Sequence, residues 1–267
     1  SVIQTLGSGV MMPGELQTTI GTAGIVASAL EAPEDNPDGR LQVFCNVAPD
    51  SWHCMGVSLN AGGAMSWFRD TMGSMGQGSE KLSFDEIVAK AAMSPAGAKG
   101  LFFLPYLYGE RCPHPDPIAR GAFVGLTARH EGGDLARSVM EGVTYALRDI
   151  HGLMQRIGMQ HSVIKASGGG ARSVLWRQMQ ADLFDCEVVT TEGAAEGGAF
   201  GAALVAGVGV GIWPDAKTAA QLCKPLTRQM PDRETGDTLR RAFGIFEGLY
   251  PALSQSFAAI AEAKLDA

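Results

Sequence analysis

The sequence lacks the features of a membrane protein and of a nucleic-acid-binding protein. It has no run of about 18 apolar residues, and residues 1–14 do not have the layout of a signal peptide. The formal net charge is -7, whereas nonspecific nucleic-acid binding needs a basic face. With 267 residues, of which 46% are hydrophobic and 18% charged, the composition is that of a globular enzyme with a substantial core. We expect neither a membrane nor a nucleic acid as partner.

Cysteines and histidines are few and scattered. The sequence holds five of each, and no two cysteines form a Cys-x-x-Cys pair. An odd number of widely spaced cysteines argues against a disulfide framework and against a structural zinc site. We therefore expect a cytoplasmic protein that holds no metal through its own side chains.

Strand and helix patterns alternate along most of the chain. Strands are predicted at 16–30 (two strands broken by glycines), 43–47, 53–59, 101–107, 163–166 and 186–190. Helices are predicted at 60–72, 84–93 (after a glycine- and serine-rich loop), 134–150, 173–184, 196–206 and 239–263. This alternation indicates an α/β fold, and the early hairpins make its central sheet mixed. No linker divides the chain, so residues 1–267 are predicted to form one domain.

The strongest helical pattern begins near Asp134, which is predicted to be the N-cap. Apolar residues then recur at helical spacing from Leu135 to Ile150. Under this prediction Asp134, Glu141 and Asp149 form the cap and the polar face of the helix.

Glycine is unusually frequent, with 35 residues. Three glycine-centred turns are Ile20-Gly21-Thr22-Ala23-Gly24, Ala61-Gly62-Gly63-Ala64 and Gly168-Gly169-Gly170-Ala171-Arg172-Ser173. Because glycine has no Cβ, backbone N–H groups in such turns can approach a phosphate, and a helix N-terminus adds partial positive charge. None of the three is a Walker loop or a dinucleotide fingerprint. A single glycine turn is usually structural, but three in one domain favour a nucleotide.

Four groups of segments carry a more specific signal. They are Phe103-Leu104-Pro105-Tyr106-Leu107-Tyr108-Gly109-Glu110-Arg111 with Pro113-His114 and Asp116-Pro117; Gly121-Ala122-Phe123-Val124-Gly125-Leu126 with Asp134-Leu135 and Ser138-Val139-Met140-Glu141; Gly168-Gly169-Gly170-Ala171-Arg172-Ser173 with Leu175-Trp176-Arg177-Gln178; and Gly201-Ala202-Ala203. Together they cover nearly the whole chain. In this combination the chain resembles the C-terminal half of the FGGY carbohydrate kinases, and within them it looks most like the xylulokinases.

The resemblance implies a fold and a reaction. Family members have an actin-like ATPase (ribonuclease H-like) fold of two domains, with ATP and sugar meeting in the cleft between them. This chain would be the nucleotide-binding domain and would use ATP and Mg²⁺. The expected reaction converts D-xylulose to D-xylulose 5-phosphate, with ribulose, gluconate or glycerol as alternative substrates. A noncatalytic ATP-binding module is the alternative of a different class. Since relatives commonly dimerise, a homodimer is also an expectation.

The resemblance also implies the phosphate contacts. Thr22, with Gly21 and Ala23, matches the position that contacts the β- and γ-phosphates, and Gly62 and Ser66 match positions near the phosphates and the ribose. Two residues depart from the family pattern. Ala23 stands where a serine is common, and Ser66 stands where some relatives have glutamine.

The adenosine-binding turn of the family is matched by Gly169, Gly170, Ala171 and Val174. A Gly170→Val substitution is therefore expected to put a branched side chain against the adenosine while the fold survives. The neighbouring Arg172 would either stack on adenine or stay solvated, and Trp176 is expected to pack in the core.

No residue of the chain is assigned as catalytic. Gly7-Ser8-Gly9 and Pro13-Gly14 match the pattern that follows the family's catalytic aspartate, which then falls immediately before Ser1. That aspartate would be the general base, and the sugar would be bound mainly by a preceding N-terminal domain. The 267 residues alone are therefore expected not to phosphorylate a sugar.

Glu110, Arg111 and His114 lie in the proline-containing loop. The first two are either functional or, as is commoner for a charged pair at the base of a loop, an ion pair that pins it. His114 lies between two prolines and is expected to anchor a turn.

Overall fold

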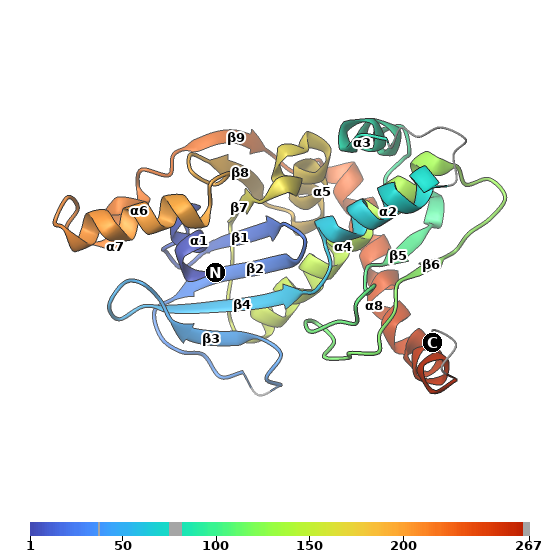
Figure 1. Ribbon diagram of the computed structural model, residues 1–267, viewed down its shortest axis with the longest axis horizontal. Coiled ribbons are helices and arrows are strands. Elements are labelled where there is room, and N and C mark those ends of the chain that lie inside the picture. The colour runs from blue at the N-terminus through green and yellow to red at the C-terminus, as the bar shows by residue number, and fades with distance from the viewer. Residues whose placement is uncertain (37, 75–81, 264–267) are drawn as a thin grey trace.

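The computed structural model describes residues 1–36, 38–74 and 82–263 (Figure 1). Over these residues the centre is a mixed sheet with the strand order β3-β4-β2-β1-β7-β8-β9. Its strands are β1 (Glu15–Ile20), β2 (Gly24–Leu30), β3 (Gln42–Cys45), β4 (Trp52–Ser58), β7 (Val163–Ser167), β8 (Glu187–Thr191) and β9 (Pro225–Gln229). β1, β7 and β8 are parallel, and the other neighbours are antiparallel. A second, two-stranded sheet pairs β5 (Phe102–Leu104) with β6 (Ala122–Val124).

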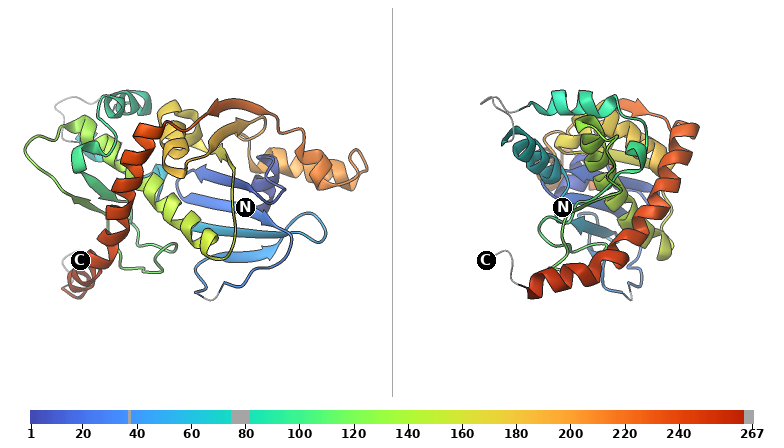
Figure 2. Two further views of the ribbon diagram at one scale, coloured as in Figure 1. Left: turned by 180° about the vertical axis from the view of Figure 1, so that it is seen from behind. Right: turned by 90° about the vertical axis from the view of Figure 1, so that its right-hand side faces the viewer.

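Helices cover both faces of the large sheet. The helices of the described residues are α1 (Val2–Gly7), α2 (Gly62–Ser74), α3 (Phe84–Ala92), α4 (Gly132–Arg156), α5 (Val174–Phe184), α6 (Gly198–Gly209), α7 (Ala216–Ala220) and α8 (Arg233–Glu262), with 3₁₀ turns η1 (Ala98–Gly100) and η2 (Gly169–Arg172). The long helix α4 crosses one face of the sheet, as the view from behind shows (Figure 2). On the opposite face lies α1, which packs against α6.

The two faces of strand β1 pack against different elements. Leu16 is fully buried in the core that α4 shares, and on the same face Thr18 Oγ1 donates to Gln180 Oε1 of α5 at 2.6 Å. The other face is polar, because Gln17 accepts a hydrogen bond from Thr5 Oγ1 of α1 at 2.7 Å. Successive side chains of a strand alternate between its two faces. The apolar side chains of β1 are therefore buried, while its polar side chains find hydrogen-bond partners.

Most of the predicted elements are present near the predicted bounds. The strand predicted at 101–107 is shorter than expected, since β5 ends at Leu104, where Pro105 offers no N–H to the ladder. Helices α1 and α7 and strands β6 and β9 were not predicted. The loop predicted between α2 and α3 falls mostly on residues 75–81, outside the described residues.

The prediction for the start of α4 is wrong. The N-cap is Glu131, and Asp134 is the third helical residue, where its carboxylate accepts the backbone N–H of Glu131 at 2.9 Å. Asp134 and Glu141 are 2% exposed, and Asp149 is 6% exposed, so they do not form a polar outer face. Burial opposes the ionisation of Asp134, but hydrogen bonds from Ser94, Glu131 and Lys99 outweigh it and lower its pKa to about 2.

None of the helices in the described residues combines the length and the hydropathy that a membrane crossing requires. All five cysteines are free thiols, as expected from their number and spacing.

Buried histidines predict that the protein loses stability in mild acid. Burial is the main cause that lowers the pKa to about 4 for His53, His114 and His161, and to about 3 for His151. An unfolded histidine titrates near pH 6.5, so between about pH 6.5 and 4 the unfolded chain binds more protons than the folded one. The free energy of unfolding therefore decreases as the pH is lowered through this range. Asp149, whose pKa burial raises to about 6, opposes this trend, and so do Glu110, Glu141 and Asp182, whose pKa values burial also raises. The predicted fall is the excess of the histidine effect over the effect of these carboxyls.

Denaturant unfolding measured from pH 7.5 to 4.5 checks this expectation. The denaturant midpoint should fall steadily as the pH is lowered below 6.5. A His130→Gln control should show the same dependence of the midpoint on pH, since His130 is not one of the buried histidines. A midpoint that is constant or rises toward pH 4.5 would contradict the assignment of neutral buried imidazoles.

Candidate functional site

A large cavity lies where the three glycine turns meet. Its volume is about 1310 Å³, and its wall contains Gly21 and Thr22, Gly62 and Gly63, and Gly169 and Gly170. The remaining wall comes from α2, from α3, from the first turn of α5 and from Tyr108 in the loop between β5 and β6. The turns that the sequence singled out separately therefore form one site.

The sheet topology explains why these turns meet. β1 and β7 are parallel neighbours, with Thr19 paired to Ser167, so the turn after β1 and the 3₁₀ turn η2 leave the same edge of the sheet. β4 runs antiparallel to β2 and ends beside its start, with Ser58 paired to Gly24. As a result, the turn from β4 into α2 arrives at that edge as well. Ligands of α/β proteins commonly bind at this edge, beyond the carboxyl ends of parallel strands.

Backbone hydrogen bonds join two of the turns directly. Gly62 N–H donates to Gly21 O at 2.7 Å, while the N–H groups of Ala61 and Gly63 donate to Thr22 O at 2.8 and 3.1 Å. A Cβ at Gly62 would lie 2.6 Å from Gly21 O, a distance that real side chains do not reach. Packing between backbones thus requires glycine at position 62.

Thr22 lines the cavity, and its hydroxyl has no protein partner among the described residues. Thr22 is exposed and lines the cavity, and within residues 1–36, 38–74 and 82–263 its Oγ1 makes no hydrogen bond. Its main-chain carbonyl is occupied by the start of α2, so the residue is held by its backbone while its hydroxyl stays available. A ligand oxygen is a suitable partner for such a group.

The glycines of the third turn differ in what surrounds them. A Cβ on Gly169 would meet nothing within 4 Å, whereas a Cβ on Gly170 would lie 2.6 Å from Ile20 Cβ and 3.2 Å from a ring carbon of Trp176. The expectation that Gly170→Val spares the fold is therefore wrong: the new side chain would collide with the core. Gly169 is the glycine of this turn that is open to the cavity.

Of the other predicted site residues, two line the cavity and two do not. Ser66 and Val174 line the cavity, although the hydroxyl of Ser66 donates to Gly62 O one helical turn earlier at 3.2 Å. Ala23 and Ala171 are not part of the wall, and Ala171 is buried at 7% exposure.

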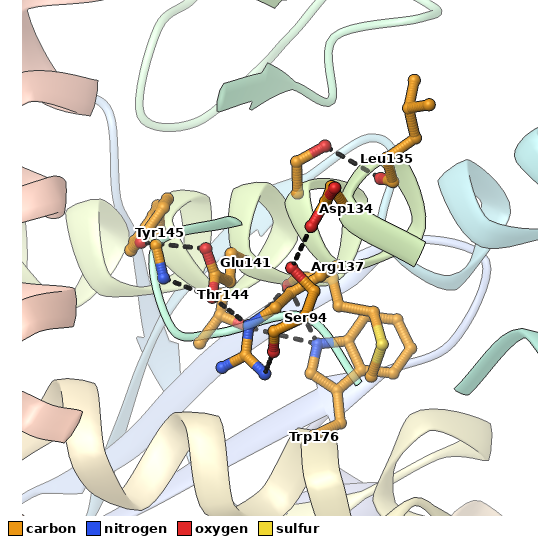
Figure 3. Close-up of polar contacts among 11 residues, drawn as sticks. Ser94, Asp134, Leu135, Arg137, Glu141, Thr144, Tyr145 and Trp176 are labelled. Atoms are coloured by element: carbon orange, nitrogen blue, oxygen red, sulfur yellow. Dashed lines mark hydrogen bonds and ion pairs between the residues drawn. The ribbon is translucent and has the colours of Figure 1, made fainter. Parts of the chain in front are cut away.

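Buried polar contacts join α4 to α5, which carries part of the cavity wall (Figure 3). Trp176 Nε1 donates to Met140 O and to Thr144 Oγ1, both at 3.1 Å, which fixes α5 behind η2. Trp176 is 4% exposed, as predicted for a core residue. On the same helix, Arg137 Nε donates to Glu141 Oε1 at 2.7 Å.

Sequence reasoning missed part of the wall. Phe84 of α3 and Tyr108 line the cavity at 43% and 73% exposure. Exposed aromatic side chains are a signal for a binding surface, but exposure could not be read from the sequence.

Few charges line the cavity. In the described part of the wall, Arg172 is the one cation, and Asp70 and Asp85 are the carboxylates. A polyanion would therefore be bound by N–H groups, hydroxyls and an accompanying cation. No group of three or more His, Cys, Asp or Glu side chains that could hold a metal ion occurs among the described residues.

Comparisons with known proteins point to one family. The model of the FGGY family of carbohydrate kinases, C-terminal domain, matches residues 16–210. A xylulose kinase of Staphylococcus epidermidis is 35% identical over 94% of this chain and 49% of its own length. A gluconokinase of Bacillus licheniformis is 32% identical over 97% of this chain and 51% of its own length. The chain spans about half the length of the curated relatives it matches.

Solved structures agree with the predicted fold. The ligand-bound xylulose kinase from Lactobacillus acidophilus superposes with a TM-score of 0.88 at 26% identity, over 97% of this chain and 51% of that one. The predicted α/β class, an actin-like ATPase domain with a mixed central sheet flanked by helices, is confirmed by this match.

The two glycines of the third turn give a paired test. Gly170→Val should lower the free energy of unfolding by ~1–3 kcal/mol or more, because it overpacks the core at Ile20. Gly169→Val should unfold like the wild type, since its side chain enters open space. Urea denaturation of both variants checks this, and equal destabilisation of the two would contradict the described orientation of the turn.

Proposed function

Because the chain belongs to the FGGY family of carbohydrate kinases, we propose that residues 1–267 form the nucleotide-binding domain of an ATP-dependent sugar kinase. The convergence of the three glycine turns on one cavity is the observation that carries the proposal. The scarcity of charge on the wall agrees with it, since ATP brings Mg²⁺ to neutralise its own phosphates.

In this proposal the ATP contacts are assigned as follows. The hydroxyl of Thr22 donates to a terminal phosphate oxygen, and Gly21 lets that phosphate approach the turn after β1. The nucleoside lies along the open side of Gly169 and against the exposed Val174. Gly62, Gly170 and Ala171 act through the backbone, by shaping the turns on which the contacts depend.

ATP supplies the phosphoryl group in the reaction, and this chain binds and orients it. Transfer of a phosphoryl group depends mostly on positioning and on neutralising charge. Here the backbone contacts between the β1–β2 turn and α2 fix the position of Thr22 before any ligand arrives.

For the sugar we propose D-xylulose, with gluconate as the second candidate. The first rests on the relative named xylulose kinase, and the second on the relative named gluconokinase, which is nearly as similar. A cytoplasmic location and a homodimer remain parts of the same proposal.

Binding of MgATP to the chain tests the nucleotide role. Thr22→Val keeps the shape of the side chain but removes the hydroxyl, so affinity should fall about tenfold, the effect of one hydrogen bond to a charged group. Thr22→Ser keeps the hydroxyl and should bind within about threefold of the wild type. Calorimetry measures both, and an unchanged dissociation constant for Thr22→Val would refute the phosphate contact.

A sugar panel tests the substrate. In a full-length kinase that contains this chain as its nucleotide-binding domain, D-xylulose should give the highest kcat/KM for ADP release among D-xylulose, D-ribulose, gluconate and glycerol. A higher value for gluconate would replace the first candidate by the second. No ADP release with any of the four would leave the ATP-binding module as the function.

A further inference from the structure

Glu110 is a buried carboxylate next to the cavity but outside its wall. It lies in the loop between β5 and β6 and is 3% exposed. Its Oε2 accepts from Ser58 Oγ at 2.6 Å, and its Oε1 accepts the backbone N–H groups of Leu59 and Arg111 at 2.8 and 2.7 Å. The expected ion pair with Arg111 is not among the described contacts, and the Arg111 side chain is exposed. Glu110 therefore pins the loop through hydrogen bonds to another element.

The element that Glu110 holds leads directly into the cavity. Ser58 is the last residue of β4, and Leu59 follows it. Two residues later, Ala61 N–H donates to Thr22 O, and Gly62 N–H donates to the neighbouring carbonyl. The position of the Thr22 turn thus depends on a segment whose other end is held by the β2–β4 ladder and by one buried carboxylate.

The same loop brings Tyr108 to the rim of the cavity. Gly109 has a φ of +72°, and a Cβ there would lie 2.6 Å from Pro117 O, so the turn packs closely against the returning strand of the loop. Glu110 and Asp116 exchange backbone hydrogen bonds at 2.8 and 3.0 Å. Fixing Glu110 therefore also fixes Tyr108, two residues earlier.

A second anchor of the loop lies away from the cavity. The ring of His114 stacks on Tyr250 of α8, with centroids 3.9 Å apart and an interplanar angle of 11°. His114 Nε2 lies 3.7 Å from Asp149 Oδ2 of α4, and Tyr250 Oη donates to Asp116 Oδ2 at 2.8 Å. None of these residues belongs to the cavity wall. This anchor serves as a control, because its hydrogen bond, ion pair and ring contact join the same loop to α4 and α8 and not to β4 or α2.

We propose, on the basis of the proposed nucleotide-binding function, that Glu110 is a positioning residue for the nucleotide site. It joins the loop between β5 and β6 to the end of β4, and through Ala61 and Gly62 it sets the direction of the Thr22 hydroxyl. Loss of the carboxylate removes the acceptor of the Leu59 N–H and the partner of the buried Ser58 hydroxyl, and the turn ahead of α2 loses this support.

Dissociation constants for MgATP, measured by calorimetry beside thermal melting, test the proposal. Glu110→Ala should weaken binding about tenfold. Glu110→Gln should restore binding to within about threefold, because its amide oxygen still accepts from Leu59 and the hydroxyl of Ser58 can accept from its NH₂. His114→Gln should lower the melting temperature and leave the dissociation constant unchanged.

Ser58→Ala keeps the proposal testable if Glu110→Ala does not fold. It removes a single bond to the carboxylate and should weaken MgATP binding by about threefold. Wild-type affinity in a folded Glu110→Ala or Ser58→Ala protein would overturn the positioning role, and so would an equal loss of affinity in His114→Gln. A wild-type chain that does not bind MgATP would instead overturn the proposed function itself.

Discussion

The site depends on the hydrogen bonds between the turn after β1 and the start of α2. Three N–H groups of α2 and its preceding residue point at the carbonyls of Gly21 and Thr22, and this approach leaves no room for a side chain at position 62. The carbonyls are thereby satisfied, and Thr22 is held at the cavity wall with its hydroxyl free of protein partners among the described residues. A change in either turn would move the hydroxyl, even if every side chain of the wall were kept.

Other buried polar contacts hold the remaining parts of the site. The indole of Trp176 fastens α5 to α4, which places Gly169 at the cavity, and Glu110 fastens the end of β4. These contacts lie in a low-dielectric interior, where a lost partner is costly. Preorganisation of this kind suits a site with few charges, because backbone and hydroxyl groups bind a phosphate well only when they are already directed at it.

The sequence predicted most of the sheet and the helices, because hydrophobic periodicity reports which elements can bury one side. It also predicted the glycine turns that form the cavity. It could not predict which side of each glycine is open, so Gly170→Val was expected to spare the fold, although a Cβ there would meet Ile20. Likewise Asp134 was assigned to the cap of α4 and Glu141 to its polar face, since periodicity does not reveal the buried partners Ser94 and Arg137 that satisfy them.

A crystal structure of the chain with a non-hydrolysable ATP analogue and Mg²⁺ is the most direct test of the central claim. The account predicts a terminal phosphate oxygen within hydrogen-bond distance of Thr22 Oγ1 and the nucleoside against the open side of Gly169. An ordered analogue bound elsewhere on the chain, or an empty cavity at saturating analogue, would contradict it.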